Sequence, residues 1–249
     1  MRSIRSILIV SAALAGCAAP GTQRDETSGG PAMTALPKDI HPESRSRLPL
    51  PKREALDEQG KRVYDSVLDP KRPTLAGFQG PAGIWLHSPR VGEPFREMNR
   101  ILRNEVPLEP RLRELAILVT AREFDSQFEW TAHEPVALKE GLDPKVLDTV
   151  KFRRAVSGAP EREAAIIAFG RELFRDRKVR AETYAEMVRV FGQTAVVNLT
   201  ALMANYAFTA VMLTAFDQQL HQGRKPLLPF PDPDTTARNK SSGPNVHVL

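Results

Sequence analysis

The chain has 249 residues, and 35 Lys and Arg against 30 Asp and Glu leave a formal net charge of +5. Acidic residues are interspersed among the basic ones, and no basic run carries interleaved aromatic side chains, which argues against a nucleic-acid partner. The single cysteine, Cys17, excludes an internal disulfide and a zinc site built from thiolates, so stability depends on a hydrophobic core.

The first 16 residues are typical of a bacterial export signal. Arg2 and Arg5 precede an apolar stretch, residues 7–16, that is too short to span a bilayer. The segment LAGC, which ends at Cys17, resembles a lipobox, in which the signal is cut before the cysteine and the cysteine is acylated. The alternative is an ordinary cleaved signal with an incidental cysteine. Loss of the two arginines lowers the net charge from +5 to +3.

A lipid on Cys17 predicts a protein anchored in the bacterial cell envelope and facing the periplasm. Ala18 follows the cysteine at the position where, by resemblance to lipoproteins, an Asp favours retention in the inner membrane. We therefore favour the outer membrane.

Composition divides the rest of the chain into three parts. Residues 17–50 are rich in Pro, Gly, Ser and Thr and are expected to be a flexible tether. Residues 51–221 are expected to form one domain. The tail, residues 222–249, is again rich in Pro and Ser and is expected to wrap a surface or to be disordered.

Apolar residues of the domain recur at helical spacing almost throughout, so we predict an all-α fold. Ser88 and Asp143 each precede a proline and are expected to cap helices, while Gly141 and Gly192 mark helix ends. The stretch RPTLAGFQGPAGIWLHSP contains too many glycines and prolines for a helix and is expected to be an ordered loop. The expected helices are 52–68, 89–104, 110–124, 127–140, 144–152, 160–176, 180–191 and 194–220.

The stretch 194–216 is apolar enough to raise the possibility of a membrane span. However, Thr194, Asn198, Asn205 and Thr209 lie near one side of the helix at helical spacing. Asparagine amides are costly in lipid but are readily satisfied between packed helices. We therefore favour a buried core helix or a subunit-interface helix over a span.

A histidine and two carboxylates form the candidate site. Glu129 precedes His133 by one helical turn, and Glu114 lies 19 residues before His133 in an apolar run. A buried carboxylate needs a cation or donor nearby, and a histidine on the adjacent helix is a natural partner. With Ser126, the residues form the pattern E-x11-S-x2-E-x3-H.

These residues resemble the carboxymuconolactone decarboxylase family, which includes the alkylhydroperoxidase D branch. The resemblance covers about residues 50–220 and is strongest in LRELAILVTAREFDSQFEWTAHEPVALKEGL. The stretches GPAGIWLHSP and YAEMVRVFGQTAVVNLTALMANYAF support it. In the peroxidase branch the pattern is E-x11-C-x2-C-x3-H, so Glu114 and His133 match, whereas Ser126 and Glu129 occupy the cysteine positions. The resemblance implies that family's all-α fold and a homo-oligomer, either a trimer or a hexamer.

The missing thiols argue against dithiol peroxidase activity, because a serine cannot form the sulfenic acid that a second thiol resolves. The decarboxylase branch implies a lyase that acts on a small carboxylated lactone or related organic acid, without a cofactor. We expect His133 to be the general acid and base, with Glu114 orienting its ring and Glu129 holding or retuning it. The expectation fails if Glu114 and His133 lie more than about 6 Å apart.

Three further residues are candidate substrate-binding groups. Arg122, about 80° around the helix from Glu114 by ideal geometry, is a possible counter-charge for a substrate carboxylate. Ser126 and Trp130 are further candidates, although Trp130 also fits a core position. No second histidine stands at metal-ligand spacing from His133, so we expect no metal site.

Several alternatives stay open. The pair Glu129 and His133 is also compatible with an ordinary helix ion pair. The same scaffold also suits another hydrolase, isomerase or lyase that acts on a small acid or lactone. A non-catalytic envelope lipoprotein that kept the fold after losing its thiols is a third possibility.

Overall fold

The computed structural model describes residues 36–71 and 74–229. The expected export signal with Cys17, the first part of the expected tether and the tail from residue 230 onward lie outside these residues.

Within the described residues, regular secondary structure is helical apart from one isolated β-bridge between His41 and Ser46. This confirms the all-α fold class. A 3-10 turn (Arg53–Ala55) precedes α1, and a π-helix (Glu172–Asp176) follows α7. The α-helices are α1 (Glu58–Leu68), α2 (Pro81–Trp85), α3 (Pro89–Asn104), α4 (Pro110–Glu123), α5 (Gln127–Lys139), α6 (Pro144–Lys151), α7 (Glu161–Arg171), α8 (Ala181–Phe191) and α9 (Gln193–Ala215).

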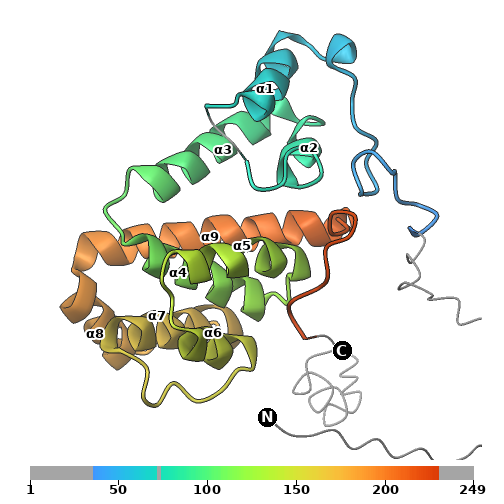
Figure 1. Ribbon diagram of the computed structural model, residues 1–249. Helices are drawn as coiled ribbons and strands as arrows, with labels where there is room; N and C mark the ends of the chain where they lie inside the picture. The colour runs from blue at the N-terminus through green and yellow to red at the C-terminus, as the bar shows by residue number, and fades with distance from the viewer. Residues whose placement is uncertain (1–35, 72–73, 230–249) are drawn as a thin grey trace, which may run out of the picture. The chain divides into compact units, whose positions relative to one another are not determined.

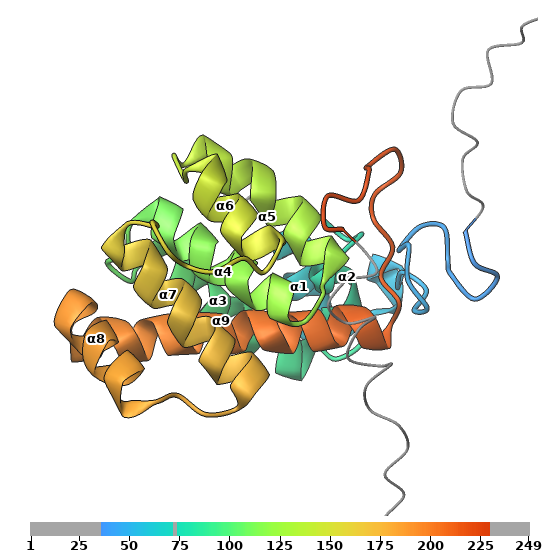
Figure 2. The ribbon, with the colours of Figure 1, turned by 90° about the horizontal axis from the view of Figure 1, so that it is seen from below.

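Helix α4 is the central helix of the core. Leu112 and every residue from 114 to 122 are buried, because neighbouring helices cover α4 on nearly all sides. It packs against α5, α6, α7 and α9, and Figures 1 and 2 show α4 between α9 and the pair α6 and α7. A carboxylate on this helix, such as Glu114, is therefore removed from water and needs partners within the protein.

Helix α9 has the length and composition of a membrane span, but half of its most apolar stretch is buried inside the protein. It packs against α3, α4 and α8. The amide of Asn99 in α3 donates to Oδ1 of Asn205 at 2.7 Å, and the Thr209 hydroxyl donates to the carbonyl of Asn205 at 3.0 Å. The expected polar stripe of α9 thus includes two buried side chains, and one of them, Asn205, has a partner on the packed helix α3, which supports the core-helix interpretation.

Three helix boundaries differ from the expected ones. Helix α1 begins only at Glu58, because the Asp57 side chain accepts a hydrogen bond from the Gly60 amide at 2.7 Å and caps the helix there. Helix α2 lies in the stretch that was expected to be a loop, and Pro81 occupies its first turn. Helix α9 ends at Ala215 rather than near residue 220, and Asp217 just beyond it has a left-handed φ of 46°.

The expected caps hold in part. Asp143 caps α6 through a 2.8 Å bond from the Lys145 amide, as predicted. Gly141 and Gly192 have φ angles of +86° and +81°, the conformation that ends a helix, which confirms both stops. Ser88 is different, because its side chain makes no capping hydrogen bond to α3. The helix begins there through the proline at its first position instead.

Both segments that flank the expected domain are folded against it where the structure describes them. The Arg47 amide donates to the Phe216 carbonyl at 2.9 Å, and Arg45 bonds to the chain just after α9. From Leu36 onward the expected tether is therefore attached to the end of α9. On the other side, the Leu228 amide donates to Oε1 of Gln127, and Nε2 of Gln127 donates to the Leu228 carbonyl, so the described start of the tail packs against α5.

Candidate active site

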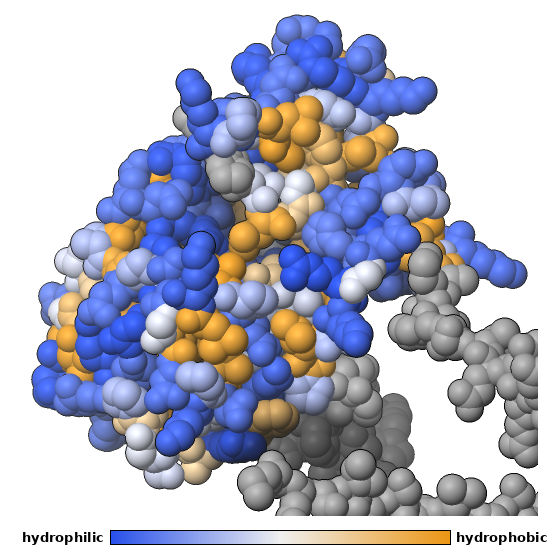
Figure 3. All heavy atoms as spheres, in the orientation of Figure 1, coloured by the Kyte–Doolittle hydropathy of each residue, from blue (hydrophilic) through white to orange (hydrophobic). Residues whose placement is uncertain are grey.

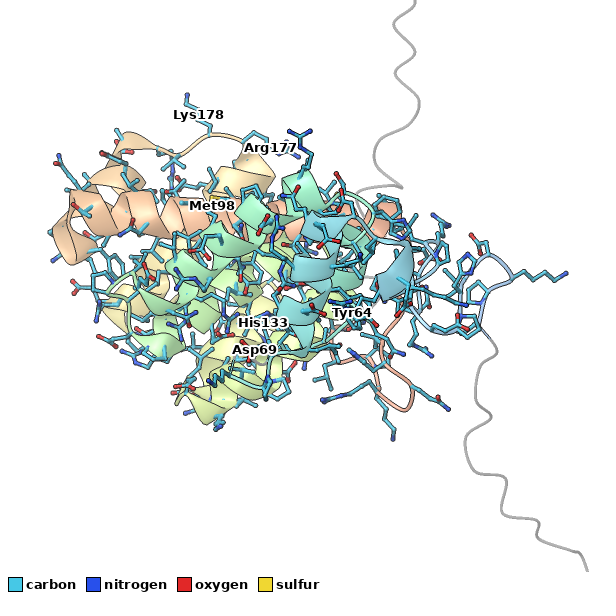
Figure 4. The ribbon with its side chains drawn as sticks, turned by 90° about the horizontal axis from the view of Figure 1, so that it is seen from above. Tyr64, Asp69, Met98, His133, Arg177 and Lys178 are labelled. Atoms are coloured by element: carbon cyan, nitrogen blue, oxygen red, sulfur yellow. The ribbon has the colours of Figure 1, made fainter. Side chains whose placement is uncertain are left out.

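His133 and Glu114 form a buried hydrogen bond between α5 and α4. Nδ1 of His133 lies 2.6 Å from Oε2 of Glu114, and both side chains are almost fully inaccessible to solvent. Helices α4 and α5 are packed neighbours, which brings together residues 19 positions apart in the sequence. His133 is labelled among the helices in the view from above in Figure 4.

Glu129 faces the other ring nitrogen. Its Oε2 atom lies 3.4 Å from Nε2 of His133, one turn along the same helix, and its side chain is also buried. Glu114 also pairs with two arginines, since Nη2 of Arg103 lies 3.0 Å from its Oε1 atom and Nε of Arg113 lies 3.9 Å from the same atom. The buried cluster therefore joins one imidazole to two carboxylates, and two guanidinium groups balance their charge.

The two carboxylates set the protonation state of the histidine. Burial acts to lower the pKa of His133, but hydrogen bonds to Glu114 and Glu129 outweigh burial and raise it above its usual value. Burial acts to raise the pKa of Glu114, but His133 and Arg103 outweigh burial and lower it. Nδ1 therefore carries a proton that it donates to Glu114, and the raised pKa of His133 favours a second proton on Nε2, the nitrogen that faces Glu129.

Tyr206 on α9 joins this cluster. Nη1 of Arg103 donates to its hydroxyl oxygen at 2.5 Å, and its ring stands perpendicular to the His133 ring with 5.2 Å between centroids. Burial raises the pKa of Tyr206 to about 12. Neither Arg103 nor Tyr206 was identified from the sequence, because each lies in a helix with no local spacing that relates it to His133.

A cavity of about 980 Å³ reaches this cluster. Glu129, His133 and Tyr206 contribute to its wall from α5 and α9, while α1, α2, α3 and described residues between α1 and α2 line much of the remainder. Trp85 and Phe95 add apolar lining, and Figure 3 shows apolar surface between the α1–α3 helices and the helices below them. Glu129 and His133 thus lie, almost fully buried, at the wall of a cavity that suits a small molecule with an apolar body.

The cavity also contains a guanidinium group that has no acidic partner among the described residues. Arg96 on α3 is partly buried, burial lowers its pKa, and its one hydrogen bond goes to the Ser66 hydroxyl at 3.3 Å. By contrast, the neighbouring Arg100 is neutralised by Glu97 and Glu105. Arg62 and Lys71 also line the cavity without an acidic partner among the described residues, but both are exposed. Arg96 is therefore the partly buried cavity cation best placed to take the carboxylate of a ligand.

The three candidate substrate-binding residues do not line the cavity. Arg122 is buried and lies 2.5 Å from Asp125 at the end of α4. Ser126 stands at the start of α5, where its carbonyl accepts from the Trp130 amide. Trp130 is fully buried and its indole donates to Glu134. For Trp130 the reason is helical periodicity, since it is rotated by about 100° around α5 from Glu129 and so points into the core.

No protein-family model matches the sequence, and no curated protein matches it either. Solved structures do match. The alkylhydroperoxidase AhpD core of an uncharacterized peroxidase-related protein from Ralstonia eutropha JMP134 superimposes with a TM-score of 0.59 and 18% identity, over 75% of this chain and 100% of that one.

Two structures of the debrominase Bmp8 match as well. The apo form has a TM-score of 0.55 and 16% identity over 72% of this chain and 92% of that chain. A cysteine-to-alanine variant in complex with 2,3,4-tribromopyrrole has a TM-score of 0.54 and 17% identity, over 70% of this chain and 90% of that chain. The chain has the alkylhydroperoxidase D-like fold. At these identities the likeness defines the fold, and the activity has to be argued from the residues of the site.

Among the residues that the structure describes, no group of three or more His, Cys, Asp or Glu side chains is arranged to hold a metal ion. The polar groups of the site are instead paired with one another.

Proposed function

We propose that the protein is a proton-transfer enzyme, a lyase that acts on a small carboxylated lactone or related organic acid. The observation that carries the proposal is the row of Glu129, His133 and Glu114, in which Glu129 and His133 line a cavity. A histidine held between two carboxylates keeps a proton at a defined position beside the space for a substrate.

Decarboxylation would use that proton. The bond between the substrate carbon and its carboxylate breaks, carbon dioxide leaves, and the electron pair passes into the unsaturated ring as a dienolate. The carbon then takes the proton that Glu129 and His133 share, and water restores it afterwards. Because Glu129 and His133 both line the cavity and Oε2 of Glu129 lies 3.4 Å from Nε2, we assign the acid to the pair rather than to the imidazole alone.

Arg96 supports the choice of a carboxylate substrate. Arg96 is a cavity cation without an acidic partner among the described residues. It can therefore take the role of counter-charge to the substrate carboxylate, for which the sequence suggests Arg122. A guanidinium binds a carboxylate through two parallel hydrogen bonds, which would orient the substrate as well as attract it. It would also offset the repulsion between the substrate and Glu129.

The ligand of a protein with the same fold supports the proposed size of the substrate. Bmp8 binds 2,3,4-tribromopyrrole, an unsaturated five-membered ring, and a lactone of the proposed kind has a ring of similar size. Thiol peroxidase chemistry is disfavoured, because Ser126 and Glu129 stand at the thiol positions and Cys17 is the sole cysteine of the sequence.

A turnover assay tests the proposal. Purified protein is incubated with a panel of carboxylated unsaturated lactones, and release of carbon dioxide is followed together with loss of ultraviolet absorbance. We expect turnover of at least one member, and His133→Ala lowers it by about 100-fold or more. Glu140→Gln, at the exposed C-cap residue of the same helix, is the matched control. Folded wild-type protein that turns over no member, or an unaffected His133→Ala protein, would overturn the proposal.

We further propose that the protein is anchored in the bacterial cell envelope by a lipid on Cys17 and forms a homo-oligomer, a trimer or hexamer. The lipobox-like segment supports the anchor, and the family resemblance supports the oligomer. Size-exclusion chromatography with light scattering measures the oligomer directly, and a monomer would contradict it.

A further inference from the structure

Tyr206 lines the cavity, and its hydroxyl group accepts a hydrogen bond but donates none to a described residue. The oxygen accepts from Nη1 of Arg103 at 2.5 Å. The hydroxyl itself donates no hydrogen bond to any residue that the structure describes. A buried donor without an acceptor costs free energy unless a ligand supplies one.

We propose that Tyr206, supported by Arg103, is the oxyanion donor of the site and binds the enolate oxygen that forms when the substrate loses its carboxylate. This inference rests on the proposed function and adds the catalytic group that stabilises the intermediate. Preorganised donors aimed at a developing negative charge are commonly the largest single contribution to catalysis.

The protonation state of Tyr206 fits a donor and not a base. Because burial raises its pKa to about 12, the hydroxyl keeps its proton over the whole working range of pH. The guanidinium of Arg103 polarises that hydroxyl through its oxygen, which strengthens the bond that the hydroxyl can donate.

The position of the ring also fits. Tyr206 and His133 are 5.2 Å apart between ring centroids and contribute to the same wall. One part of a bound substrate can therefore face the Glu129 and His133 pair while its oxygen faces Tyr206. Arg103 connects the two halves, since Nη2 bonds to Glu114 and Nη1 bonds to Tyr206.

The electron balance closes without a further reactant. The electron pair left when the carbon–carboxylate bond breaks passes through the unsaturated ring onto the lactone carbonyl oxygen, where Tyr206 stabilises the negative charge through a hydrogen bond and keeps its own proton. The pair returns to carbon when Glu129 and His133 deliver their proton there. Tyr206 is thus needed between the two steps and is unchanged at the end.

Binding of phenols of graded acidity tests the oxyanion site without a known substrate, since a phenolate oxygen resembles an enolate oxygen. Nitrophenols bound to wild-type protein are expected to be phenolates by their absorbance. Tyr206→Phe is expected to weaken phenolate binding by about 10- to 100-fold, the loss of one hydrogen bond to a charged group. Tyr184→Phe, at a half-exposed tyrosine of α8, is the matched control and is expected to bind as wild type does.

Equal phenolate affinity in wild type and in folded Tyr206→Phe would overturn the inference. So would phenols that bind wild-type protein in their neutral form, a measurement that needs no variant. If lactone turnover is absent but phenolate binding depends on Tyr206, the proposed function fails and the oxyanion site stands. If a lactone is turned over, Tyr206→Phe is expected to lower kcat by about 100-fold with little change in KM.

Discussion

The Nε2 atom of His133 lies 3.4 Å from Oε2 of Glu129, while its Nδ1 atom is bonded to Glu114. Both nitrogens of the imidazole are therefore paired with carboxylates, and Glu129 and His133 both line the cavity. Under the proposed function, Glu129 takes a direct part in proton transfer, beyond the holding or retuning that its sequence position suggests.

Glu129→Gln is expected to lower kcat by about 100- to 10,000-fold, because the amide cannot exchange the shared proton. The measurement is a pH profile of kcat on whichever lactone the wild type turns over, with Glu140→Gln as the control. A variant that keeps the maximal rate and only shifts the profile would show that Glu129 tunes His133 without transferring the proton.

The buried His133 is expected to make stability depend on pH. Burial lowers its pKa, but Glu114 and Glu129 outweigh burial and raise it, so the folded protein binds this proton more tightly than the unfolded chain does. The stabilisation is fully present below the unfolded pKa of about 6.5 and is lost as pH rises through the folded pKa.

Urea unfolding of wild type and His133→Gln over a series of pH values measures this linkage. The advantage of the wild type in free energy of unfolding is expected to shrink above about pH 6.5. At the acid end, Glu114 has a lowered pKa, so its own contribution is present above about pH 4.5 and is lost as pH falls through the folded pKa. A difference between the two proteins that stays constant from pH 5 to 9 would be the contrary result.

Arg96→Gln is expected to raise KM for a carboxylated substrate by about 10- to 100-fold, the loss of a charge-assisted hydrogen bond to the carboxylate. The control is Arg100→Gln on the same helix, whose guanidinium is already paired with Glu97 and Glu105. Steady-state kinetics of both variants separate the two effects. An unchanged KM in Arg96→Gln would assign the substrate carboxylate to another group.

Gly83→Ala is expected to destabilise the fold by about 1–3 kcal/mol through overpacking. A methyl group on Gly83 would lie 2.1 Å from the carbonyl oxygen of Phe78, a backbone atom that cannot simply rotate away. Helix α2 and the cavity wall at Ala82 and Trp85 would shift with it. Denaturant unfolding gives the loss, and a variant as stable as wild type would mean that the α2 segment relaxes freely.

Cys17→Ser is expected to release the protein from membranes, because the serine cannot carry the lipid that a lipobox cysteine receives. Fractionation of cells that express each form measures the distribution between membrane and soluble fractions. Continued retention of the serine variant would contradict the lipoprotein assignment and would point to α9 as the membrane-attached element.

Local spacing along the chain determined much of this protein. Helical periodicity predicted most helices and the all-α class, and the spacing of Glu114, Glu129 and His133 identified three groups that the fold brings into one buried row. Side-chain chemistry alone also disfavoured a thiol mechanism, since Ser126 stands where a thiol would be needed. Each of these inferences depends only on residues within one helix or on two helices adjacent in the chain.

The tertiary structure decided which other groups join that row. Arg96 and Arg103 come from α3, and Tyr206 comes from α9, so they meet the site only where these helices pack. Arg122 shares a helix with Glu114 but lies outside the cavity, beside Asp125. Periodicity defines the faces of one helix, but only the packing of the helices selects which face meets which, because that selection depends on side-chain shape across the whole core.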